Sequence, residues 1–283
     1  AFIDFFSPNG QTDVTFTVQC IEGSSGTVII RASAPGFTDQ TGTVTVVQPA
    51  FRLEGLTTST TSLSTDTAFY VALGLPSAGN GNLNAIQSVR VGSGGLTATI
   101  TNSNAAVGQL TTLAGSGQSR TVTVAEGSPY SAGSVATGGV AFDPIGGGTT
   151  TVAASIPGVI ATAAATVTVT VTTPAITLFS LPTTVGAGLQ APGYTARLGA
   201  SQHGGVTMRI ESSNAAAARV APNASTAGTA FIEVFIPNGQ TDVTYTIQGI
   251  EGASLPAAPT LTASALGFTT ATGTVNVVQP AFR

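Results

Sequence analysis

The feature that most constrains this fold is a segment that occurs twice, in which apolar and polar residues alternate after an Asn-Gly pair. The later copy covers residues 237–248 and the earlier copy covers residues 8–19. In the later copy Val243, Tyr245 and Ile247 share one face. Successive side chains of a β-strand point to opposite sides, so a period of two predicts a strand with one buried face.

The two copies extend well beyond this segment. Residues 1–23 match residues 230–252 at 17 of 23 positions, and residues 36–52 match residues 267–283 at 14 of 17. The Gly-Gly and Ser-Asn-Ala-Ala positions of residues 94–106 recur in residues 204–216. We therefore expect residues 53–173 and 174–283 to be two complete units of one plan, with the clearest strand alternation, of Val and Thr, at residues 166–172. Residues 1–52 should be the second half of a third unit, with strands near residues 2–7, 13–21, 27–33 and 41–47.

Short apolar strands between turn residues predict an all-β protein. The chain has 35 Gly and 15 Pro, which divide it into many short segments. Only 7% of its residues are charged, it contains no Lys, and the net charge of -4 argues against nucleic acid as a partner.

There is no apolar run long enough for a membrane span. The linkers around residues 47–51 and 171–176 carry Pro and predict a semi-rigid rod.

Two short motifs carry a resemblance, Ser212-Ser213-Asn214 after Ile210 and the Gly-Thr-Val run at residues 273–275. Through them the sequence resembles tandem bacterial immunoglobulin-like (BIG-type) domains. The resemblance implies immunoglobulin-like β-sandwiches in series, as in secreted and cell-surface proteins, and it implies no catalytic residues. The fold class that we expect is therefore all-β, with tandem immunoglobulin-like sandwiches in a semi-rigid rod.

Residues for chemistry are sparse, and we expect no enzyme and no cofactor. His203 is the only histidine, lies in a Gly-rich turn context and has Ser93 as its counterpart in the repeat. One His and one Cys do not suffice for a metal site of nitrogen and sulfur ligands. We interpret Cys20, whose counterpart is Gly249, as a small buried core residue. The four tyrosines do not cluster in the sequence, which favours core packing over a glycan-binding face.

Calcium is the inorganic ligand left to weigh, because its sites are built from oxygen atoms. Three acidic pairs recur between the repeats, Asp13 with Asp242, Glu22 with Glu251 and Asp4 with Glu233, and the first two pairs are weak calcium candidates. The competing interpretation, which we favour, is that Asp13 and Asp242 cap the Asn-Gly turn and that Glu22 and Glu251 precede a loop glycine.

The sequence predicts a structural protein at the cell surface or outside the cell, a subunit or segment of a surface filament or giant repeat adhesin. Its expected partner is itself, as a homopolymer or through neighbouring repeats, with a cell-surface or glycan ligand as a further possibility. The alternative is a passive stalk or carbohydrate-binding module of a secreted enzyme. What flanks this segment distinguishes them: further repeats favour the filament, and a catalytic domain favours the stalk.

Residues 1–52 pose a separate problem, because half a sandwich exposes the inner face of its sheets. Val14, Phe16 and Val18 would meet water, and burying each contributes roughly 1.5–3 kcal/mol. The chain begins in a strand-like pattern, so we expect it to be a portion of something longer. Two sources can complete the half: an upstream part of the same polypeptide, or a neighbouring subunit that donates strands. We favour packing against a neighbouring chain.

Overall fold

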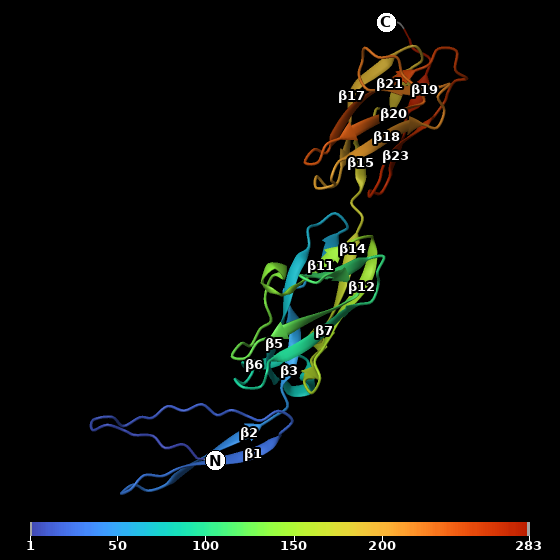
Figure 1. Ribbon diagram of the computed structural model, residues 1–283. Coiled ribbons are helices and arrows are strands. Elements are labelled where there is room, and N and C mark those ends of the chain that lie inside the picture. The colour runs from blue at the N-terminus through green and yellow to red at the C-terminus, as the bar shows by residue number, and fades with distance from the viewer. Residues whose placement is uncertain (1, 282–283) are drawn as a thin grey trace.

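The computed structural model describes residues 2–281, which form β-strands and short 3₁₀ turns. Three regions follow one another in chain order along an elongated molecule (Figure 1). We call them the N-terminal segment (residues 2–47), the middle unit (residues 50–172) and the C-terminal unit (residues 175–278). The 3₁₀ turns are η1 (Ala78–Asn80), η2 (Val135–Thr137) and η3 (Ala163–Ala165). Within the described residues, no helix has the length and apolar character that crossing a membrane requires.

The middle unit consists of two sheets. One has the spatial order β10 (Ser119–Val124), β7 (Leu96–Asn102), β12 (Gly148–Ser155), β14 (Thr166–Thr172) and β4 (Ser59–Thr61). The other has the order β13 (Ile160–Ala161), β3 (Ala50–Glu54), β5 (Thr67–Pro76), β11 (Val140–Pro144), β8 (Gly108–Thr112) and β9 (Gly115–Gly117), with β6 (Leu83–Ile86) on β5.

The core of the middle unit lies between these sheets. In β14, Val169 and Val171 are buried and the threonines that alternate with them are exposed, as a period of two requires. The largest fully buried side chains of this core are Phe51, Phe69, Ile100, Leu110 and Phe142. Because Phe51 belongs to β3, the sheet of the middle unit already begins at Ala50.

The C-terminal unit repeats this arrangement. One sheet has the order β15 (Ile176–Phe179), β17 (Gln190–Leu198), β21 (Asp242–Gly249) and β19 (Ala218–Ala221). The other has the order β20 (Phe231–Ile236), β18 (Val206–Ser212), β22 (Thr260–Ala265) and β23 (Ala271–Thr274). The Asn-Gly turn between β20 and β21 is formed as expected, with Gly239 at a φ of 92° that favours glycine.

Both units also share a parallel pair between an early strand and the last one. In the middle unit β4 pairs with β14, and in the C-terminal unit β16 (Thr184–Gly186) pairs with β24 (Asn276–Val278). All other pairs between strands of the C-terminal unit are antiparallel. Two packed sheets with this strand order are an immunoglobulin-like sandwich. The protein is therefore all-β and consists of tandem immunoglobulin-like sandwiches in a semi-rigid rod.

The junctions between the regions are short and hydrogen-bonded. Pro174, in the linker before the C-terminal unit, accepts a hydrogen bond from Thr269 N–H (2.9 Å), and Ile176 donates to Thr269 O (2.9 Å) within that unit. Leu63, from the turn after β4, packs against the core of the C-terminal unit. At the other junction, Ile160 donates its N–H to Pro49 O (2.8 Å). The hydrogen bonds thus hold each linker proline to the unit that follows it, and the Leu63 contact joins the middle and C-terminal units.

The N-terminal segment differs from its counterpart, and two predictions about it are wrong. Residues 2–7 and 13–21 were expected to form strands, but here the strands are β1 (Gly26–Ala32) and β2 (Gln40–Val46) alone. The counterparts of the missing strands are β20 and β21, which obtain their hydrogen bonds from β17, β18 and β19. The described residues of the N-terminal segment supply no such neighbours, so the backbone stays irregular. Cys20, expected in a core, is exposed for the same reason.

One buried group of the C-terminal core has no hydrogen-bond partner. The hydroxyl of Tyr245 is the single buried side-chain N or O atom of this kind among the described residues. Burying a hydroxyl without a partner costs about 1–3 kcal/mol. We therefore expect Tyr245→Phe to raise the free energy of unfolding by about 1 kcal/mol, measured by urea denaturation. Phe16 occupies this position in the other copy, so the repeat accepts phenylalanine.

The pH dependence of the same residue provides a second readout. Burial, followed by the nearby Tyr194, raises the pKa of Tyr245 to about 12. An unfolded tyrosine titrates near about 10, so the folded state favours the neutral form. This contribution is fully present below about pH 10 and is lost as the pH rises from 10 through 12. Tyr245→Phe should lack this alkaline loss; an equal loss in both proteins, or a destabilised variant, would contradict the assignment.

Candidate functional site

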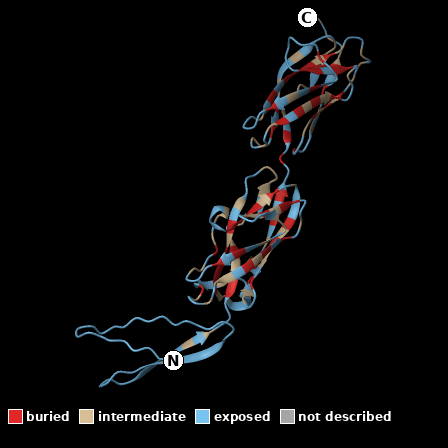
Figure 2. Cartoon of the chain, viewed as in Figure 1, coloured by how far each residue is buried: buried red, intermediate tan, exposed pale blue. Residues whose placement is uncertain are grey.

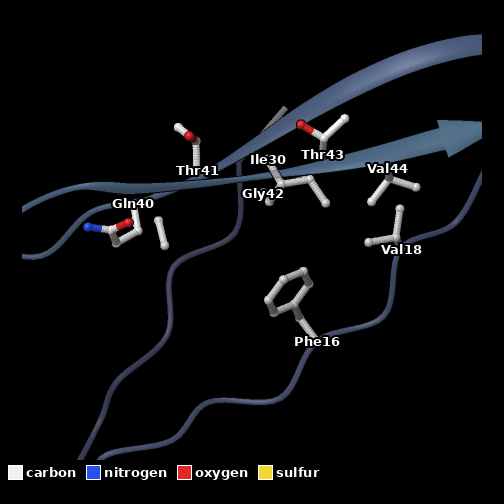
Figure 3. A pocket seen from close by; sticks show the side chains of 9 residues that line it. Phe16, Val18, Ile30, Gln40, Thr41, Gly42, Thr43 and Val44 are labelled. Carbon is white, nitrogen blue, oxygen red and sulfur yellow. The ribbon is translucent and has the colours of Figure 1, made fainter.

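The candidate site is an apolar gap in the N-terminal segment. Phe16 and Val18 lie on an irregular stretch and are directed toward Ile30 and Val44 on the hairpin (Figure 3). The gap between them has a volume of about 370 Å³. Ala32 and residues 40–43 complete its lining. We call Phe16, Val18, Ile30, Ala32 and Val44 the N-terminal inner face.

The counterparts of this face form the core of the C-terminal unit. Phe16 is 55% exposed, whereas Tyr245 at the same repeat position is 1% exposed. Val18 is 44% exposed and its counterpart Ile247 is 0% exposed. Figure 2 shows the contrast along the whole molecule, with buried residues in the two units and exposed ones through the N-terminal segment. The same pattern of side chains therefore forms a core in one copy and an open surface in the other.

The hairpin of the N-terminal segment already has the register of a complete sandwich. Ile30 lies opposite Gly42 in the β1–β2 pair, and Leu261 lies opposite Gly273 in the β22–β23 pair. Ile30 and Leu261 are repeat counterparts, as are the two glycines. The Asn-Gly turn is also formed, because Gly10 has a φ of 91°. The N-terminal segment thus already contains the hairpin and the Asn-Gly turn, which are the parts that need no contacts from a first half.

The recurring acidic residues occupy different environments, and two of them pair with arginine. Asp242 accepts hydrogen bonds from Arg197 Nε (2.6 Å) and Nη2 (2.7 Å), and this contact lowers the pKa of the carboxyl below its ordinary value. Glu22 accepts from Arg90 Nε (3.0 Å) and Nη2 (2.8 Å) of the middle unit, and its pKa is lowered in the same way. Each carboxylate therefore already has a cation beside it.

Asp13 and Glu251 complete the set of calcium candidates. Asp13 is exposed in the N-terminal segment, and Glu251 is exposed in the turn after β21. Within residues 2–281, no group of three or more His, Cys, Asp or Glu side chains is placed to hold a metal ion. The four candidates lie in separate places along the rod. The turn-capping interpretation stays a prediction; besides Arg197, Asp242 accepts a hydrogen bond from Thr241 Oγ1 (3.1 Å).

His203 lies in the turn before β18 and has a structural environment. Its Nε2 is 2.9 Å from Gln240 O, and its backbone N–H donates to Asn238 Oδ1 (2.9 Å). Its ring meets Phe268 edge-on at 6.0 Å between centroids. These contacts tie the turn before β18 to the Asn-Gly turn of residues 237–240, and no acid or nucleophile is among them.

The structure brings together two tyrosines that the sequence separates. The rings of Tyr70 and Tyr130 meet edge-on with centroids 5.5 Å apart, and Tyr130 is exposed. Tyr70 donates its hydroxyl to Glu54 Oε2 (2.7 Å), and this hydrogen bond raises the pKa of Tyr70. Sequence reasoning missed this pair, because its members lie 60 residues apart and come together through the isolated bridge between Ala72 and Tyr130.

The comparisons with known proteins gave no match in sequence and matches of low TM-score among solved structures. No family model matches the sequence, and no curated protein matches it. The S-layer protein SbsC is 18% identical over 90% of this chain and 32% of its own, with a TM-score of 0.32. The adhesin InvE of Yersinia pseudotuberculosis is 14% identical over 81% of this chain and 58% of its own, with a TM-score of 0.29.

A member of glycosyl hydrolase family 2 from Bacteroides cellulosilyticus is similar at the same level. It is 15% identical over 82% of this chain and 28% of its own, with a TM-score of 0.28. The chain thus spans about a third of the length of SbsC, at 32%, and a similar share of the hydrolase, at 28%.

Proposed function

We propose that this chain is an extracellular structural protein, a subunit or segment of a surface filament or giant repeat adhesin built from BIG-type domains. It assembles through contacts between β-sandwiches and carries out no catalysis of its own. The observation that carries the proposal is the serial arrangement of sandwich units of one plan, joined by short junctions with packed side chains. Such a chain spans distance and bears load, because each unit contacts its neighbours at its ends.

The composition supports a role as an exposed, inert spacer. Only 7% of the residues are charged and none is Lys, so the surface derives its polarity mainly from Thr, Ser, Asn and Gln. The threonines of β14 are exposed, while Val169 and Val171 between them are buried. A Thr-rich strand surface stays soluble without the charges that would attract nucleic acid.

The distribution of chemically active side chains supports the same role. The histidine and the paired acids described above contact turn residues and arginines, and they do so in different units. Nothing brings a nucleophile, a base and a cleft together among these groups. The apolar gap at the N-terminal inner face has the character of an unfinished core rather than of a polar substrate site.

The experiment that tests this function is localisation on cells that produce the protein. Antibodies raised against the full chain should label intact, unpermeabilised cells, and brief treatment with an external protease should remove the label. Labelling only after permeabilisation would overturn the proposal. Label that is instead released into the medium together with a hydrolase activity on the same polypeptide would favour the stalk of a secreted enzyme.

A further inference from the structure

We propose that the N-terminal inner face is a docking site whose occupant is a first-half segment of this same repeat, with the strand pattern of residues 174–229. The proposal deepens the assembly role above, on which it rests, by naming the face and what it receives. It concerns folding in solution and can be tested apart from where the protein is located.

The C-terminal unit shows what covers this face when a first half is present. There β21 lies between β17 and β19, with Ala196 opposite Val243 on one side and Val220 opposite Ile247 on the other. Val277 of β24 lies beside Val185 of β16 in a parallel pair. All of the covering residues come from residues 174–229. The counterparts of the covered strands are residues 13–20 and 40–47 of the N-terminal segment.

The N-terminal segment has kept five of the apolar positions that this cover would bury. Val14, Phe16 and Val18 match Val243, Tyr245 and Ile247, and Val44 and Val46 match Val275 and Val277. All five C-terminal counterparts are at most 4% exposed. An ordinary solvent face does not carry apolar residues at alternate positions, whereas a sheet face made for burial does.

The exposed backbone indicates strands as the occupant rather than a small ligand. Residues 13–20 have no strand pairing, while their counterpart β21 pairs on both edges, with β17 and with β19. An occupant must therefore satisfy backbone N–H and C=O groups on two edges as well as fill the gap. Strand addition from a β-rich partner does both. A second copy of this chain is a poorer fit, because the first half of its C-terminal unit is already covered by its own second half.

One residue limits how closely the occupant can copy residues 174–229. Cys20 stands where the C-terminal unit has Gly249, and a side chain at Gly249 would collide with the backbone carbonyl of Gly186. An occupant that fits beside Cys20 must therefore lie farther from residues 13–20 at its counterpart of Gly186. A copy of residues 174–229 should fit once Cys20 is replaced by glycine.

The test uses the full chain with Cys20→Gly and a copy of residues 174–229 fused directly ahead of Ala1, which reproduces the connection from residue 229 to residue 230. Hydrogen exchange is followed by mass spectrometry over residues 13–20. We expect exchange there to slow by at least about a hundredfold relative to the unfused Cys20→Gly chain. A parallel sample mixes the unfused chain with the separate 174–229 polypeptide, and protection there would show that a neighbouring molecule can supply the first half.

The matched control carries Ala196→Asp and Leu198→Asp in the added copy only. Both positions are buried in β17, so the charged copy should be unable to seat and residues 13–20 should exchange rapidly. Unchanged unfolding of residues 50–281 checks that the rest of the chain is intact. Rapid exchange in the fusion itself would overturn the proposal. The proposal would also be overturned if residues 13–20 of the parent chain alone became protected as the protein concentration rises, because a second copy would then be the occupant.

Discussion

Replacing Ile247 with alanine is expected to lower the free energy of unfolding of the C-terminal unit by about 2–5 kcal/mol. Ile247 is 0% exposed in the middle of β21, where strands pair on both of its sides. Truncation removes buried apolar surface and leaves a cavity that packed neighbours on two strands cannot fill. Calorimetry should show the transition of this unit at a lower temperature and that of the middle unit unchanged.

The repeat supplies a matched control for this prediction. Val18 is the counterpart of Ile247 and is 44% exposed. We expect Val18→Ala to change stability by no more than about 0.5 kcal/mol in the chain as it stands. A large loss at Val18 would show that the N-terminal inner face is already buried in solution, and a small loss at Ile247 would contradict the core described above.

Replacing Asn102 with alanine is expected to cost about 2–3 kcal/mol in the middle unit. Its buried amide joins strands of both sheets, since Nδ2 donates to Gly108 O (2.7 Å) and Oδ1 accepts from Thr150 Oγ1 (2.7 Å). Nδ2 also lies 2.6 Å from Gln118 Oε1. Removing the amide takes one hydrogen-bond partner from each of these groups, at a site where Asn102 is 6% and Thr150 2% exposed.

The measurement is the urea unfolding of the middle unit, with Thr121→Ala as the control. Thr121 is on β10 and exposed, so its replacement should leave stability within about 0.5 kcal/mol of the parent. Thr150→Val should reproduce part of the Asn102→Ala loss, and the double variant should lose less than the sum of the two, because they share one network. Full additivity would contradict the network.

The Ile247 and Asn102 variants test whether the two sandwich units are stable independently of each other. Each unit has its own core, so truncation in one should leave the other folded. The contact of Leu63 with the C-terminal core is the exception, because it crosses the junction.

Much of this architecture could be predicted from residue patterns alone. The alternation in residues 166–172 and 242–248 predicted β14 and β21, since only a strand places every second side chain on one face. The Asn-Gly pairs predicted the turns at Gly10 and Gly239, where a positive φ excludes most other residues. The match between residues 1–52 and residues 230–283 pointed to the N-terminal inner face. It showed that residues 1–52 correspond to the second half of a sandwich, and the described residues contain no first half for it.

Only the tertiary structure decided which of these strands form. Residues 13–20 and 242–249 carry nearly the same sequence, yet one stretch is irregular and the other is a central strand, because strand hydrogen bonds need neighbours that lie far away in the sequence. For the same reason Cys20 is exposed and Gly249 is buried. The Asn102 network and the Tyr70–Tyr130 pair were likewise beyond sequence reasoning, since their members meet only when separate strands are placed side by side. The local residue pattern determined which secondary structure each segment is able to form, and the contacts across the sheets determined which structure it does form.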